Sequence, residues 1–177
     1  ETLGSKAQIV AVSKTHPIND ILPLIDNGHI HFGENKVQEA SNKWSNNIHN
    51  FKHVKLHMLG KLQTNKVKQA VNLFDYIHSL DSTKLAKKIA TEQKKINKNL
   101  KLFIQINIGN EINKSGIPVH ELESFYSYAV EELNLNVIGL MCIPPVDSSP
   151  KSSFQLMKKL SNKVSVNELS MGMSSDY

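Results

Sequence analysis

The sequence predicts an α/β protein built as a (β/α)8 barrel of the TIM type. Strand-like and helix-like segments alternate along the 177 residues, with no linker or low-complexity stretch between them. Repeated βαβ units imply a parallel sheet with right-handed crossovers, which either closes into a barrel or stays open as a doubly wound sheet. No Gly-x-Gly-x-x-Gly follows a predicted strand and no Walker loop is present. The regular alternation therefore favours the barrel.

Seven strands are predicted from short apolar runs, at residues 8–14, 30–33, 55–59, 76–80, 102–108, 136–143 and 168–173. The run at 102–108 is nearly continuous Leu, Phe and Ile, as expected for a strand that is buried on both faces. A full barrel needs an eighth strand and typically about 250 residues. We therefore expect residues 1–177 to form one barrel domain that lacks its last βα unit.

Helices are predicted between these strands, at residues 17–27, from 36 onward, and at about 65–73, 83–98, 120–133 and 152–163. The clearest is 83–98, where an apolar stripe faces inward and lysines cover much of the remaining surface. Ser82 is its predicted N-cap, and Gly28 ends the first helix.

Composition excludes several classes of protein. All 21 basic residues are lysines and the net charge is +5, but nucleic-acid readers rely on arginine for bidentate contacts, so we expect no nucleic-acid partner. The longest apolar runs are too short to span a bilayer, so no membrane partner is expected. A single cysteine, Cys142, cannot form an internal disulfide and suits a reducing compartment, which predicts a cytoplasmic location.

Lys14 is the leading candidate for chemistry. It ends the strand-like run 8–14 and is followed by Thr15, His16 and Pro17. In a barrel the carboxyl ends of the strands form the active site, and a partly buried neutral amine there can attack an aldehyde. The competing interpretation is that Lys14 only marks where the strand reaches water. The many polar residues at the predicted strand ends favour the first interpretation.

A metal site is not expected. His49, His53 and His57 recur every four residues, as ligands on one helix face would. The strand predicted at 55–59 interrupts that helix, however, and Asn46, Asn47 and Asn50 favour a loop before it. Cys142 lies on a predicted buried strand and is interpreted as a small apolar filler.

Seven motifs closely resemble one family, and they occur in the family's order across nearly the whole chain. The family is that of the pyridoxal phosphate homeostasis proteins, single-domain relatives of the alanine racemase barrel. The motifs are AVSKTHP at 11–17, FGENKVQE at 32–39, HMLGKLQTNK at 57–66, IHSLD at 77–81, KSG at 114–116, GLM at 139–141 and LSMGMS at 169–174.

This resemblance implies a pyridoxal 5′-phosphate (PLP) protein of fold type III, with the cofactor held covalently on Lys14 as an internal aldimine. Asn35 would lie beside the cofactor. The pocket around its ring would be lined by His57, Leu59, Ser79 and Met141, and part of its phosphate cradle would be made by Ser170, Gly172, Met173 and Ser174. The family's pattern also includes a helix before the first strand and an arginine on the last strand. We expect both to be missing here. The sequence contains no arginine, so we also expect a weakened phosphate site.

The resemblance leaves two function classes. The first is a carrier that takes part in intracellular PLP homeostasis and hands the cofactor to PLP-accepting apoenzymes. The second is a PLP-dependent amino-acid racemase, which needs another acid/base group on the opposite face of the substrate. In two-domain alanine racemases a tyrosine of a second domain has that role, and of Tyr76, Tyr126, Tyr128 and Tyr177 only the last could stand at such a place. The carrier is favoured, with no catalytic residue assigned, and we expect a monomer.

Overall fold

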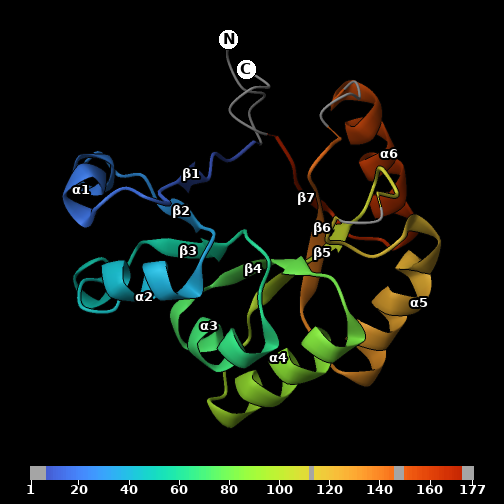
Figure 1. Ribbon diagram of the computed structural model, residues 1–177, viewed down its shortest axis with the longest axis horizontal. Helices are drawn as coiled ribbons and strands as arrows, with labels where there is room; N and C mark the ends of the chain where they lie inside the picture. Colours follow the sequence, from blue (N-terminus) through green and yellow to red (C-terminus); the bar gives the residue numbers. More distant parts are fainter. Residues whose placement is uncertain (1–6, 112–113, 146–149, 173–177) are drawn as a thin grey trace.

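One curled sheet of seven parallel strands lies at the centre of the computed structural model, which describes residues 7–111, 114–145 and 150–172 (Figure 1). The sheet runs in sequence order from β1 to β7, and each neighbouring pair is parallel. This order confirms the predicted barrel-type α/β fold. The strands are β1 (Ala11–Val12), β2 (His31–Glu34), β3 (Lys55–Met58), β4 (Tyr76–Leu80), β5 (Lys101–Ile106), β6 (Val137–Cys142) and β7 (Glu168–Ser170).

Helices cover the outer, convex face of the sheet and follow each other around it (Figure 1). They are α1 (Ile18–Asp26), α2 (Val37–Trp44), α3 (Val67–Leu73), α4 (Thr83–Lys95), α5 (Leu122–Ser127) and α6 (Pro150–Lys163). Shorter turns are η1 (Ile48–Asn50), η2 (Thr64–Lys66) and η3 (Val119–Glu121), and the π-helical η4 (Tyr128–Glu132) continues α5. Within the described residues, no helix combines the length and apolarity that crossing a membrane requires.

The apolar core lies between the helices and the convex face of the sheet. Phe32 of β2 and Trp44 of α2 are fully buried and pack with their ring centroids 5.5 Å apart. Phe74, which follows α3, is also fully buried. Burying such a side chain contributes about 1.5–3 kcal/mol relative to leaving it in water. This packing leaves the concave face of the sheet free to carry polar side chains.

Some element boundaries differ from the predicted ones. The first strand, predicted at 8–14, pairs with β2 only at Ala11 and Val12. The helix predicted at 83–98 ends at Lys95, and Asn97 then adopts a positive φ of 51°, which a helix does not allow. The predicted cap is confirmed, because the Ser82 hydroxyl accepts a hydrogen bond from the Leu85 N–H at 3.4 Å.

A bulge in β4 decides which side chains reach the concave face. Two residues, His78 and Ser79, lie opposite the single residue Phe103 of β5. His78 stacks on Phe103 with ring centroids 4.2 Å apart, and Leu80 returns to the core under the helices. Side chains alternate along a strand, so the bulge directs Ser79 as well as His78 to the concave side.

Candidate functional site

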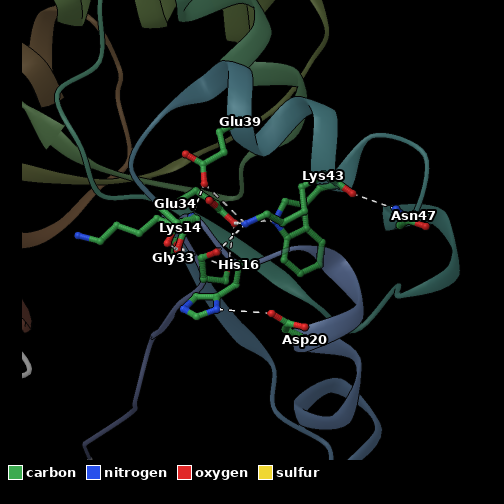
Figure 2. A network of polar contacts seen from close by, with 11 residues as sticks. Lys14, His16, Asp20, Gly33, Glu34, Glu39, Lys43 and Asn47 are labelled. Atoms are coloured by element: carbon green, nitrogen blue, oxygen red, sulfur yellow. Dashed lines mark hydrogen bonds and ion pairs between the residues drawn. The ribbon is translucent and has the colours of Figure 1, made fainter.

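Lys14 stands two residues beyond the end of β1 and is exposed. Figure 2 shows its side chain extending away from a cluster of charged residues on β2 and α2. Between described residues, no hydrogen bond or ion pair involves its amine nitrogen. The amine is therefore available to a ligand, and an amine can act as a nucleophile toward a carbonyl group.

The charged cluster behind Lys14 is centred on Glu34, the last residue of β2, whose side chain is fully buried. Its Oε1 atom accepts hydrogen bonds from the Ser13 hydroxyl at 2.8 Å, from Lys43 Nζ at 2.9 Å and from Trp44 Nε1 at 2.9 Å. Glu34 directly follows the strand predicted at residues 30–33, but no role was predicted for Lys43. The available signal was the spacing of Glu39 and Lys43, which fits an ion pair across one helical turn.

Asn35 follows β2 directly and is half-buried. Gly60 packs against its backbone so closely that a Cβ atom at Gly60 would overlap the Asn35 carbonyl oxygen. The N–H of Leu59 donates to the Glu34 carbonyl at 2.8 Å. These contacts bring the carboxyl ends of β2 and β3 together beside the end of β1, as the barrel prediction required.

A row of three histidines crosses the concave face and ends on Ser170 of β7. His31 Nδ1 lies 2.9 Å from His57 Nε2, and His57 Nδ1 lies 2.8 Å from His78 Nε2. His78 Nδ1 then lies 2.7 Å from the Ser170 hydroxyl. The prediction included His57 and Ser170, while the places of His31 and His78 in this row were missed.

Burial keeps the middle of this row uncharged. Desolvation, together with the neighbouring His78 and His31 and the more distant Lys101, lowers the pKa of His57 to about 2. Desolvation also lowers the pKa of His78 to about 3. Tyr76 stacks on the His57 ring with centroids 4.1 Å apart, which adds to its burial. Both imidazoles are therefore neutral at pH 7, so each carries one N–H donor and one acceptor nitrogen.

Other predicted site residues are distributed along the same face. Met141 of β6 is buried and pairs in register with Ser170. Ser79 is buried, and its hydroxyl has no hydrogen-bond partner among the described atoms. Gly172 has a φ of 103°, a conformation that favours glycine. The predicted residues Met173 and Ser174 lie outside the described residues.

A cavity of about 320 Å³ opens at the carboxyl ends of β3, β5 and β6. Among its lining residues are Leu59, Gln105 and Asn107, with the lysines Lys61 and Lys114. Two lysines in the lining favour an anionic ligand. A larger hollow of about 850 Å³ lies near the end of α4, where β5 and β6 begin, and none of the predicted site residues lines it.

The regularly spaced residues His49, His53 and His57, which could have suggested a metal site, do not lie on one helix. His49 and His53 are exposed residues before β3, whereas His57 is buried within it. Within the described part of the chain, no three His, Cys, Asp or Glu side chains are grouped as metal ligands would be. Cys142 is buried, and burial raises the pKa of its thiol to about 11.

Comparison with known proteins places the chain in a family. The model of the alanine racemase N-terminal domain matches residues 1–177. A pyridoxal phosphate homeostasis protein of Synechocystis is 35% identical, and the match covers 99% of this chain and 84% of the relative. The chain belongs to the pyridoxal phosphate homeostasis protein family. Its relative of that name in Escherichia coli K12 is 33% identical over 95% of this chain and 76% of the relative.

Solved structures agree with this placement. PipY of Synechococcus elongatus without PLP superposes with a TM-score of 0.90 at 33% identity, covering 98% of this chain and 85% of PipY. The structure of PipY with PLP bound superposes with a TM-score of 0.85 at 32% identity. The alanine racemase of Corynebacterium glutamicum, at 18% identity and a TM-score of 0.69, shares the fold.

Proposed function

We propose that this member of the pyridoxal phosphate homeostasis protein family binds PLP, with Lys14 joined covalently to the cofactor's aldehyde, and acts as a carrier in intracellular PLP homeostasis. The observation that carries the proposal is the unpaired amine of Lys14 beyond the carboxyl end of β1, which pairs with β2. Relatives that bear the family's name, and PipY with PLP bound, support it.

The residues present fit this cofactor. PLP is anionic through its phosphate and, when bound, supplies an aldehyde that accepts an amine. The buried hydroxyl of Ser79 lacks a partner among the described atoms, so a ligand on the concave face can satisfy it. Lys61 and Lys114 supply positive charge in the adjoining cavity. We assign Asn35, His57, Leu59, Met141, Ser170, Gly172, Met173 and Ser174 to the remainder of the site.

The carrier function is favoured over a racemase. Racemisation needs a second acid/base group facing Lys14 across the substrate. Among the described tyrosines, Tyr76 lies at the first position of β4, at the amino end of the sheet, and Tyr126 and Tyr128 lie on the helical segment after η3. Tyr177 lies outside the described residues. We assign no catalytic residue.

The remaining parts of the proposal concern organisation and partners. We propose that residues 1–177 act as one PLP-binding barrel domain, that the protein is a cytoplasmic monomer, and that it passes PLP to apoenzymes. Light scattering on the purified protein tests the monomer. Transfer is tested by mixing the loaded protein with an apoenzyme that needs PLP and following recovery of that enzyme's activity.

The direct test of cofactor binding is a titration of the purified protein with PLP, followed by visible absorbance. The wild-type protein should develop a band from the new C=N bond, and Lys14→Ala should not. Lys36→Ala is the matched control, because it removes a lysine near another strand end. A band that persists in Lys14→Ala, or one that is lost in Lys36→Ala instead, would overturn the assignment.

A further inference from the structure

Both neighbours of Lys14 are tied to charged side chains that Lys14 itself does not contact. The carbonyl oxygen of Ser13 accepts a hydrogen bond from Lys43 Nζ at 2.5 Å. On the other side, the N–H of Thr15 donates to a carboxylate oxygen of Glu39. Figure 2 shows this network on one side of the backbone and the Lys14 side chain leaving it on the other.

The network is built around a buried ion pair. Lys43 and Glu34 lie 2.9 Å apart, with exposed side-chain fractions of 7% and 0%. Oε2 of Glu34 is buried without a hydrogen-bond partner among the described atoms. Desolvating two charges costs about as much as their attraction returns, so such a pair is weak support for stability. A role in fixing local geometry explains its presence better.

The backbone held by this network is itself unusual. Thr15 has a φ of 67°, in the left-handed region that β-branched residues rarely adopt. Residues in such conformations persist only where their surroundings fix them, and they concentrate at functional sites. The bond from Thr15 N–H to Glu39 is one such restraint, and it acts on the residue next to Lys14.

We propose that Glu39 and Lys43, with Glu34, are positioning residues that hold the backbone at Lys14 so that its amine meets the PLP aldehyde correctly. The inference rests on the proposed function. In the reaction the neutral amine nitrogen of Lys14 bonds to the aldehyde carbon, the aldehyde oxygen leaves as water with the two amine protons, and a C=N bond remains. Such reactions depend strongly on the approach of the two atoms, and a misplacement of about 1 Å can slow them by about 100-fold.

The test separates covalent bonding from non-covalent binding. PLP reports on formation of the C=N bond by stopped-flow absorbance. Pyridoxine 5′-phosphate has the same ring and phosphate but no aldehyde, so calorimetry with it reports on the pocket alone. Glu39→Ala removes the acceptor for Thr15 N–H, and Glu39→Gln retains an acceptor oxygen. Glu39 is partly exposed, so neither change should unfold the protein.

We expect Glu39→Ala to slow C=N formation roughly 10- to 100-fold while its affinity for pyridoxine 5′-phosphate stays within about twofold of wild type. Glu39→Gln should recover most of the rate, and Lys43→Met should behave like Glu39→Ala. Lys88→Met, which removes one of the two lysine partners of Glu92 on α4, should leave both measurements unchanged.

If Glu39→Ala lowers the rate of C=N formation with PLP and the affinity for pyridoxine 5′-phosphate by similar factors, the network only supports the pocket. That result would overturn the inference. An unchanged rate in both Glu39→Ala and Lys43→Met would overturn it as well. In either case the wild-type protein would still show the absorbance band of the C=N bond, so the proposed function would not be contradicted. Absence of a Lys14-dependent band in the wild-type protein would instead overturn the proposed function, and the inference with it.

Discussion

The Nδ1 atom of His78 lies 2.7 Å from the hydroxyl oxygen of Ser170, although 92 positions separate the two residues in the chain. The contact joins the bulged strand β4 to β7 across the concave face. Because the other nitrogen of His78 faces His57, the hydroxyl is coupled to a row of neutral imidazoles. Ser170, which we assign to the phosphate site, is thereby held in a defined orientation.

Removing this contact should destabilise the protein. Ser170→Ala leaves the buried Nδ1 atom of His78 without a partner, which costs about 1–3 kcal/mol of the free energy of unfolding. Urea denaturation measures the loss. Ser124→Ala is the control, because the Ser124 hydroxyl donates to the Glu121 carbonyl on an exposed turn, and its effect should stay within about 0.5 kcal/mol. Equal effects of the two substitutions would contradict the role of the contact.

Stability should fall as the pH falls below 6.5. His57 and His78 have folded-state pKa values of about 2 and about 3, whereas the ordinary value is 6.5. The unfolded chain therefore binds more protons than the folded one between these limits. The stabilisation is complete above about pH 6.5 and is lost as the pH decreases, by up to about 1.4 kcal/mol per pH unit for each histidine.

Urea denaturation at pH 7.5 and pH 5.5 tests this dependence, because most carboxyl groups stay ionised in that window. A free energy of unfolding that is the same at both pH values would contradict the burial of the two neutral imidazoles.

The order of the elements could be predicted from sequence, because alternating apolar runs and amphipathic stretches imply successive βα units. Lys14 and Asn35 could be placed at strand ends for the same reason. The bulge that directs the buried Ser79 side chain to the concave face could not be predicted, because it depends on the pairing of β4 with β5. The contact of His78 with Ser170 could not be predicted either, because the sequence does not show the curvature of the sheet.

The close approach of Gly60 to Asn35 predicts a difference between two glycines. Gly60→Ala places a Cβ against backbone atoms of Asn35, which cannot move freely, and should cost about 1–3 kcal/mol of stability. Gly33→Ala places its Cβ mainly against the end of the Leu59 side chain, which can change rotamer, so its cost should be smaller. Urea denaturation of the two variants compares them, and the reverse ranking would contradict the described packing.

The proposed carrier function predicts that the protein does not racemise amino acids. Incubation with PLP and L-alanine, followed by chiral chromatography, should show no more D-alanine than PLP produces alone. Formation of D-alanine that is faster with the protein and is lost in Lys14→Ala would support a racemase in place of the carrier.

The central claim is that Lys14 is the residue that bonds to PLP. The most direct measurement is reduction of the protein–PLP mixture with borohydride, followed by proteolysis and mass spectrometry of the peptides. Reduction converts a C=N bond into a stable C–N bond, so the modified lysine can be identified. We predict that the adduct lies on the peptide that contains Lys14 and on no other at stoichiometric PLP. A modification spread over surface lysines, or one located at Lys36 or Lys61, would contradict the account.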